Sequence, residues 1–180
     1  MMSHEDIETL VEATRIVYEI GGEVTLAPYD KLSDAGSVTE FCIGGPESNK
    51  RTKVHLDNFL KGVQMAPYSN TPDSLMIMTK SENFRYEKHE EEYAILARFW
   101  STPNTLPVFL ICGQTGRANR GAVHYLAQNY DSSLRRKFDT DSFCLIVKIK
   151  SPLTYGYKVV SLVKDITESA FTEMSKEIIS

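Results

Sequence analysis

Several absences narrow the classes to which this 180-residue chain can belong. No apolar run reaches the ~18 residues that a membrane-spanning helix needs, and the opening residues are acidic, without the apolar core of a secretion signal. Basic residues are not in excess, since the formal net charge is -4, whereas binding to nucleic-acid phosphates needs a basic face. We therefore expect a cytoplasmic protein with no membrane contact and no general nucleic-acid binding.

Cysteine and histidine are scarce and scattered. Cys42, Cys112 and Cys144 each lie inside an apolar run and form no CxxC pair, which favours three reduced thiols buried in strands. Cys112 precedes a Gly-rich turn, so a catalytic thiol is an alternative, although nothing in the sequence indicates the lowered pKa it would need. The histidines show no metal-ligand spacing, so we predict no metal site. His55 and His124 are expected to be half-buried on helix surfaces.

Strand-like and helix-like segments alternate along the chain, which predicts a single layered α/β domain. The expected fold is Rossmann-like, with a mostly parallel or mixed sheet flanked by helices. Two prolines within 66–73 mark the best position for an internal seam. Apolar spacing of three and four predicts helices at 3–20, 49–61, 118–129 and 165–179. Strands are predicted at 23–27, 38–43, 74–79, 83–87, 92–100, 108–112, 142–149 and 157–163, the third and fourth forming a hairpin.

Two glycine-rich loops, GGPESN and GQTGRANRGA, each follow an apolar strand and open a helix. The first N–H groups of a helix are unpaired and carry partial positive charge, so they attract anions. Glycine lets the backbone turn sharply and approach a ligand closely. We therefore predict ligand-binding residues in both loops: Gly44, Gly45, Ser48, Asn49, Gly113, Gln114, Thr115, Gly116, Arg117 and Arg120.

Each loop also has an explanation that needs no ligand. Ser48 and Asn49 are ordinary helix caps. Arg117 and Arg120 oppose the helix dipole in the first turn, which a bound anion would explain, but they could instead pair with surface carboxylates. Neither loop is a standard nucleotide fingerprint, because the second lacks both the Lys-Ser/Thr ending of a P-loop and the G-x-G-x-x-G spacing.

Acidic residues cluster just before the apolar strand at 92–100. One interpretation of the cluster is a solvated turn. The other is that one of its glutamates enters a cleft, where it acts as a general base or binds a ribose hydroxyl. We prefer Glu91 for that role, because it points to the opposite side of the strand from Glu92. No nucleophile can be assigned by spacing, and no G-x-S-x-G elbow is present.

The order of these motifs resembles an uncharacterised family of bacterial Rossmann-like domains. The resemblance covers roughly 23–163 and departs at Asn119-Arg120, where a small Gly-Thr pair would follow the second glycine of the turn. It implies a part in bacterial signalling or conflict systems, and the family has no established activity. The matching residues are Gly44-Gly45-Pro46, Asn49, the segment 92–98, Gly113, Gly116 and Ala122.

Three functions follow as hypotheses. The first is a module that binds an anionic small molecule such as a nucleotide at both loops, with no cofactor assigned. The second is an enzyme that hydrolyses the glycosidic bond of a nucleotide with a glutamate such as Glu91. The third is a ligand-free domain that docks a protein partner or a second copy. We favour the first over the second because no acid/base pair can be assigned, and it requires both loops at one edge of one sheet.

Overall fold

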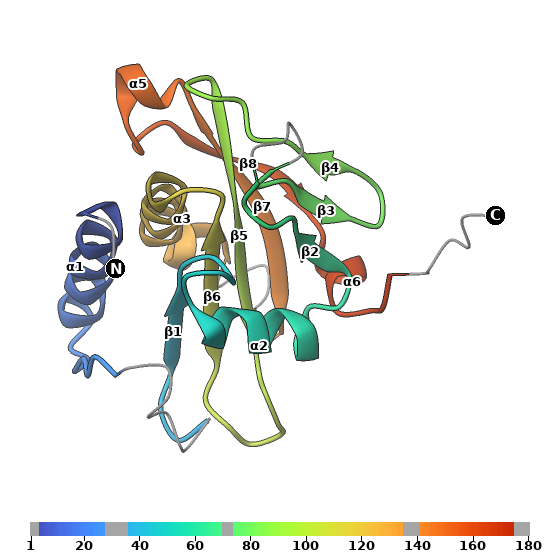
Figure 1. Ribbon diagram of the computed structural model, residues 1–180. Helices are drawn as coiled ribbons and strands as arrows, with labels where there is room; N and C mark the ends of the chain where they lie inside the picture. The colour runs from blue at the N-terminus through green and yellow to red at the C-terminus, as the bar shows by residue number, and fades with distance from the viewer. Residues whose placement is uncertain (1–3, 28–35, 70–73, 135–140, 175–180) are drawn as a thin grey trace.

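A five-stranded mixed sheet forms the centre of the molecule in the computed structural model, which describes residues 4–27, 36–69, 74–134 and 141–174 (Figure 1). The strand order is β1-β6-β5-β7-β8. Neighbours β1 and β6 are parallel, and the other three neighbouring pairs are antiparallel. The strands are β1 (Glu40–Ile43), β5 (Glu91–Phe99), β6 (Val108–Gly113), β7 (Phe143–Lys150) and β8 (Val160–Asp165).

Helices and a small second sheet surround this centre. The small sheet is antiparallel, in the order β2-β3-β4, and consists of β2 (Val63–Met65), β3 (Ile77–Thr79) and β4 (Asn83–Phe84). The helices are α1 (His4–Glu19), α2 (Lys50–Phe59), α3 (Gly116–Asn129), the π-helical turn η1 (Tyr130–Leu134), α5 (Pro152–Tyr155) and α6 (Thr167–Ala170).

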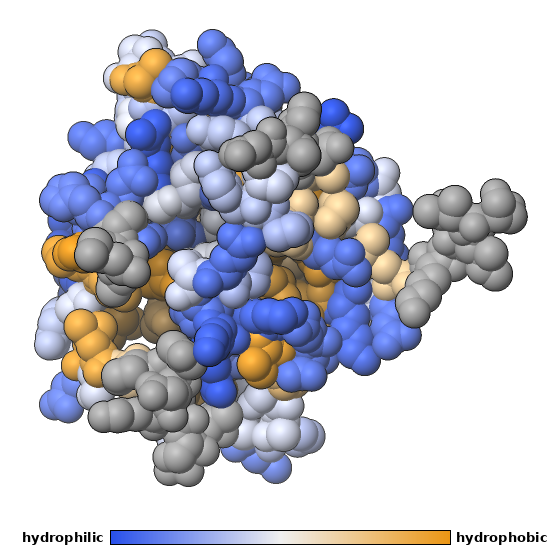
Figure 2. All heavy atoms as spheres, in the orientation of Figure 1, coloured by the Kyte–Doolittle hydropathy of each residue, from blue (hydrophilic) through white to orange (hydrophobic). Residues whose placement is uncertain are grey.

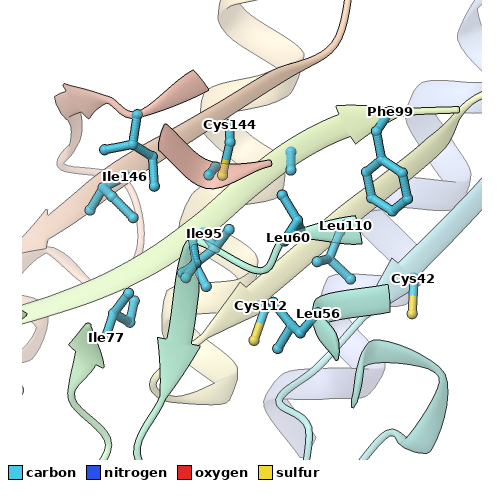
Figure 3. Close-up of a cluster of buried hydrophobic side chains, with 14 of the residues drawn as sticks. Cys42, Leu56, Leu60, Ile77, Ile95, Phe99, Leu110, Cys112, Cys144 and Ile146 are labelled. Carbon is cyan, nitrogen blue, oxygen red and sulfur yellow. The ribbon is translucent and has the colours of Figure 1, made fainter. Parts of the chain in front are cut away.

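The main sheet is apolar on both faces, because successive side chains of a strand point to opposite sides. Ala94 and Leu96 of β5 pack on the side of α3, whereas Ile95 and Ala97 pack on the side of α2, α6 and the small sheet. Figure 3 shows this second cluster, in which Leu56 of α2 and other side chains meet the sheet. The sheet is therefore covered by α3 and α1 on one face and by α2, α6 and the small sheet on the other.

The mixed α/β architecture agrees with the expectation from the sequence, although β1 and β6 are the sole parallel pair among the described strands. The short connection between β5 and β6 forces them antiparallel, because a parallel pair needs a long crossover. The predicted hairpin in 74–87 is confirmed as the antiparallel pair β3 and β4.

Two local predictions are wrong, and two short elements were missed. Residues 23–27 form no strand, and strand β2 and helix α5 were not expected. The predicted final helix at 165–179 is replaced by α6, whose Ile166 and Ala170 enter the core, and residues 171–174 are not helical. Residues 175–179 and the centre of the predicted seam, 70–73, lie outside the described residues.

The three cysteines are free and buried in β1, β6 and β7, as expected. Burial raises the pKa of the Cys112 thiol far above its usual range, so this residue is not poised as a thiolate nucleophile. Among the described residues, no helix has the length and apolarity needed to cross a lipid bilayer.

Candidate functional site

Both glycine-rich loops leave the same edge of the main sheet. Strands β1 and β6 are parallel neighbours in register, with Ile43 opposite Ile111, so their carboxyl ends coincide. The Gly44 N–H donates to the Ile111 carbonyl at 2.9 Å, which ties the first loop to the second strand. A pocket of about 360 Å³ lies between the loops, and we call it the loop pocket. The geometric requirement for a shared site is thus met.

Six of the ten predicted ligand residues line the loop pocket, namely Gly45, Ser48, Gly113, Gln114, Thr115 and Gly116. The other four predicted residues, Gly44, Asn49, Arg117 and Arg120, are not part of its lining. The remaining wall is formed by residues that the sequence did not single out as site residues: Asp6, Pro46, Glu47, Met65, Ala66, Tyr68, Leu75 and Asn119.

Asn119 is a buried polar side chain in the lining of the loop pocket. It is only 3% exposed, and its Oδ1 accepts a hydrogen bond from the Gly113 N–H at 2.6 Å. Its Nδ2 has no hydrogen-bond partner among the described residues. Asn119 Nδ2 is not among the fully buried unpaired atoms of the described residues, and the residue lines the loop pocket. This donor is therefore open to the loop pocket and available to a ligand acceptor.

Backbone donors add to this side of the loop pocket. The N–H groups of Gly45, Thr115 and Gly116 have no acceptor within the described part of the chain. Thr115 is the N-cap of α3, and its side-chain oxygen accepts from the Ala118 N–H, so the amides at the start of α3 remain free. Unpaired N–H groups at a helix N-terminus favour an anion or a strongly polar oxygen.

The lining of the loop pocket also carries carboxylates and apolar surface. Asp6 of α1 and Glu47 both line the loop pocket, and its described lining contains no lysine or arginine. Glu47 accepts the Tyr68 N–H at 2.9 Å, which holds the carboxylate in place. Met65 and Leu75 provide apolar contacts. The loop pocket therefore combines hydrogen-bond donors, carboxylate acceptors and apolar surface, and its described lining lacks the cationic side chains expected for a multiply charged anion.

Gln114 has a structural role even though it lines the loop pocket. Its side-chain oxygen accepts the Tyr93 N–H at 2.8 Å, and its Nε2 donates to the Phe84 carbonyl at 2.9 Å. The side chain thereby links the main sheet to the small sheet. Both ends of the amide are occupied, so Gln114 fixes the shape of the loop pocket more than it offers a ligand contact.

Asn49 and Gly44 shape the first loop from behind. Asn49 is the N-cap of α2 and accepts from the backbone N–H of Arg51 and of Thr52, while its Nδ2 donates to the Ile43 carbonyl. Gly44 has a φ of 116°, which side-chain-bearing residues rarely adopt. Asn49 therefore acts as a helix cap and Gly44 forms the turn, and neither role needs a ligand.

Arg120 lies on the side of α3 that faces α1, away from the loop pocket. It donates to Glu8 at 2.5 Å and to Glu12 at 3.2 Å, and its guanidinium lies 3.9 Å from the ring centre of Tyr157. It lines a separate charged hollow of about 310 Å³. Pairing with carboxylates of α1 accounts for this arginine without an anion.

Arg117 also faces carboxylates, and one of them is a buried residue of β5. Its guanidinium lies 3.4 Å from Glu5 and 3.6 Å from Glu92. Glu92 is 3% exposed and accepts the Thr115 hydroxyl at 2.7 Å. Burial raises the pKa of the Glu92 carboxyl, opposed by the hydrogen bond from Thr115 and the charge of Arg117. Glu92 thus holds Thr115, the N-cap residue of α3, in place through this hydrogen bond.

Glu91, the glutamate preferred from the sequence, lies on the other side of β5. It accepts from Lys148 at 2.8 Å and from the Tyr93 hydroxyl at 2.5 Å, and the hydrogen bond from Lys148 is the main reason that its pKa is lowered. It is not part of the loop-pocket lining. The two glutamates point to opposite sides of β5, as expected from the alternation of side chains along a strand. However, Glu92 and not Glu91 lies beside the second loop.

Another polar cluster lies at the start of β1. The sequence did not predict it, because its members are separated by many residues along the chain. Glu40 accepts from His55 at 2.8 Å and from the Nε and NH2 groups of Arg51 at 3.0 and 2.9 Å. His55 is 2% exposed, so its predicted half-buried position is wrong, and its Nδ1 has no partner among the described residues. Burial would raise the pKa of Glu40, but the bonds from His55 and Arg51 lower it to about 2.

Glu40, Cys42 and His55 are also the one described group of three side chains with ligand atoms close enough for a metal ion. Arg51 occupies both oxygens of Glu40, however, which places a fixed positive charge where a cation would bind. Burial raises the pKa of Cys42 to about 11, so the sulfur is a neutral thiol. We therefore interpret the group as a buried charge network.

No protein family, curated protein or solved structure matches the chain. The resemblance to bacterial Rossmann-like domains accordingly stays a prediction, and the assignment of a function depends on the loop pocket itself.

Proposed function

We propose that this protein binds a nucleotide or a related anionic small molecule in the loop pocket. The observation that carries the proposal is the unpaired Nδ2 of Asn119, which lies in a wall whose neighbouring backbone amides are also unpaired. One oxygen of a phosphate or carboxylate would satisfy several of these donors together. Because the described lining has no cationic side chain, we expect a ligand with a single negative charge, such as a cyclic nucleotide.

The rest of the loop pocket suits the other parts of such a ligand. Asp6 and Glu47 offer carboxylate oxygens to sugar hydroxyls, and Met65 and Leu75 offer apolar surface to a base. The volume of about 360 Å³ falls near the lower end of the range for small-molecule sites, roughly 300–1,000 Å³. The proposal thus assigns donors, acceptors and apolar surface to separate parts of one ligand.

A Rossmann-like binding edge and a place in bacterial signalling or defence belong to this proposal as well. In sheets with parallel strands, ligands bind outside the carboxyl ends of the strands. The β1 and β6 pair with its two strand-to-helix loops supplies that local geometry, while the rest of the sheet is antiparallel. The proposed similarity is therefore confined to the binding edge.

The direct test is a thermal-shift screen against nucleoside monophosphates, cyclic nucleotides, NAD, ATP and ADP-ribose, with the Gly45→Val variant as the blocked protein. A ligand at about 100 times its dissociation constant should stabilise the wild type by roughly 2.7 kcal/mol. A Cβ at Gly45 would lie 3.9 Å from the Gly113 carbonyl oxygen and 4.0 Å from the Met65 sulfur, so the Cβ of valine is accommodated and the side chain takes up space in the loop pocket. We expect the variant to fold normally and lose the shift. An equal shift in both proteins would show that the ligand binds elsewhere.

The charge of the ligand is tested by Asn119→Asp. Aspartate keeps an oxygen to accept the Gly113 N–H but replaces the unpaired donor with a carboxylate oxygen. For an anionic ligand we expect the affinity to fall about 100-fold, equivalent to about 2.7 kcal/mol, measured by calorimetric titration. Asn129→Asp, at a half-buried asparagine at the other end of α3, serves as the control. Tighter binding by Asn119→Asp would mean that the ligand is cationic.

A hydrolase remains the second candidate because two carboxylates, Asp6 and Glu47, line the same pocket. A general base must reach the reacting group directly or through one water. Chromatography of each stabilising nucleotide after incubation distinguishes the two functions, since release of a free base would indicate hydrolysis. If no nucleotide shifts the melting temperature, the protein-interaction hypothesis becomes the better account.

A further inference from the structure

Helix α1 is attached to the rest of the protein along one side. Thr9 and Ala13 are buried there, and Ile16 packs against the core cluster that includes α3. Charge pairs flank this contact and join α1 to α3: Glu5 with Arg117, Glu8 and Glu12 with Arg120, and Glu12 with His124. The orientation of α1 on α3 is therefore held by both packing and ion pairs.

The other side of α1 carries a second apolar stripe that faces solvent. Ile7 is 51% exposed, Val11 65% and Tyr18 59%, and Thr14 stands between Val11 and Tyr18. Figure 2, in the orientation of Figure 1, shows apolar surface at the left edge of the molecule, where α1 lies. Large exposed apolar side chains are common singly, but a continuous stripe along a helix marks an interaction surface.

The spacing of this stripe is that of a coiled-coil seam. Ile7, Val11, Thr14 and Tyr18 follow one another at intervals of four, three and four, which are the d and a positions of a heptad. At 3.6 residues per turn, the stripe lies about 180° around the helix from Thr9, Ala13 and Ile16. A partner helix could therefore pack on the stripe without displacing α3.

We propose that α1 pairs antiparallel with α1 of a second copy of this protein, about a two-fold axis. In that register Val11 lies opposite Thr14 of the second copy, and Ile7 lies opposite Tyr18. The residues beside the seam then match as well, because Arg15 comes opposite Glu8, which pairs with Arg120 of its own copy through one carboxylate oxygen and presents the other to Arg15. The two-fold axis repeats each contact, so the interface is self-complementary and closed.

The charge of α1 favours a second copy of the protein, and not a lipid membrane, as the partner of the exposed stripe. Between His4 and Glu19 the helix has five acidic residues and one arginine, which would repel an anionic membrane. Glu5, Glu8 and Glu12 are paired with arginines of α3, so repulsion between two copies is reduced. Arg15 is 73% exposed and pairs only with Glu19 in the described structure, so it is accessible to the second copy.

Sedimentation velocity over a wide range of protein concentrations tests the interface with a matched pair of variants. Val11→Asp introduces a charge into the stripe, whereas Val54→Asp introduces the same charge at a 45%-exposed valine of α2. We expect the wild type and Val54→Asp to dimerise and Val11→Asp to be monomeric with unchanged circular dichroism. A monomeric wild type at all concentrations would overturn the proposal, as would a dimer that Val11→Asp does not weaken.

Cysteine cross-linking tests the register, because the three native cysteines are buried. Antiparallel pairing brings position 11 next to position 14 of the second copy, within the ~7 Å between Cα atoms that a disulfide needs. The double variant Val11→Cys with Thr14→Cys should therefore form a covalent dimer under mild oxidation, and the single variant Thr14→Cys should not. A covalent dimer from Thr14→Cys alone would contradict the antiparallel arrangement. This proposal does not depend on the loop pocket binding a ligand.

Discussion

Replacing Glu40 with alanine is expected to lower the free energy of unfolding at pH 7 by about 3–5 kcal/mol, because it breaks a buried ion pair and leaves its partners uncompensated. The partner side chains have little access to water, with exposed fractions of 18% for Arg51 and 2% for His55. Chemical denaturation with urea gives the measurement. Glu40→Gln keeps the shape and part of the hydrogen bonding, so its cost should be smaller.

An exposed ion pair provides the control for Glu40. Lys53 and Asp57 pair at 2.9 Å on the surface of α2, with exposed fractions of 62% and 59%. Such pairs contribute about 0.3–0.5 kcal/mol, so Asp57→Ala should change stability little. If Glu40→Ala were as mild as Asp57→Ala, the cluster at the start of β1 would not be a stabilising charge network.

The same carboxylate makes stability depend on acid pH. The pKa of Glu40 is lowered from 4.5 to about 2 in the folded protein, so the folded state favours the ionised form. Each pKa unit corresponds to about 1.4 kcal/mol, so the fall from 4.5 to about 2 gives a contribution of roughly 3–4 kcal/mol. The contribution is fully present above pH 4.5 and is lost as the pH falls towards 2. The stability difference between wild type and Glu40→Gln should therefore shrink over that interval.

Replacing Gly113 with alanine is expected to destabilise the protein by about 2–3 kcal/mol and to abolish ligand binding. A Cβ at this position would lie 2.6 Å from the Asn119 backbone nitrogen and 2.8 Å from the Ala118 Cβ. Because the first of these contacts is backbone, α3 must shift as a unit. That shift moves the amides at the start of α3 and the Asn119 side chain, which are the proposed ligand donors. Thermal unfolding and ligand titration measure the two effects.

Gly45→Ala is the matched control at the other loop. Its Cβ would meet nothing closer than 3.9 Å, and its φ is not in the left-handed region. The variant should keep the wild-type melting temperature within error and weaken binding only through the space that its methyl group occupies. Equal loss of stability in Gly45→Ala and Gly113→Ala would mean that contact with α3 is not the reason that residue 113 is glycine.

Residues close in sequence could be interpreted correctly because local chemistry decides them. Apolar runs followed by glycines and cap residues predicted both strand-to-helix loops, and six of the ten ligand residues predicted in them line one pocket. Asn49 and Thr115 cap α2 and α3 through atoms two to three residues away. The burial of Cys42, Cys112 and Cys144 followed from their apolar neighbours.

Contacts between distant segments were not predictable in the same way. Glu40 meets His55, fifteen residues later, only because α2 folds back along β1. The sequence allowed Arg117 and Arg120 either an anion or carboxylates, and the packing of α1 supplied carboxylates from the opening residues. Asp6 reaches the loop pocket by the same packing. Asn119 was noticed only as a departure from a family pattern.

By itself, the sequence determined which segments form the two loops, which residues are buried in the central strands, and the α/β class of the fold. The tertiary structure decided which strands are neighbours, which acidic side chain lies beside each arginine, and which polar atoms remain unpaired in the loop pocket. The physical reason is the sequence separation over which each interaction acts. Capping, turns and apolar alternation depend on residues only a few positions apart. Strand order and ion pairing instead depend on where the chain returns, which many sequence-distant contacts determine together.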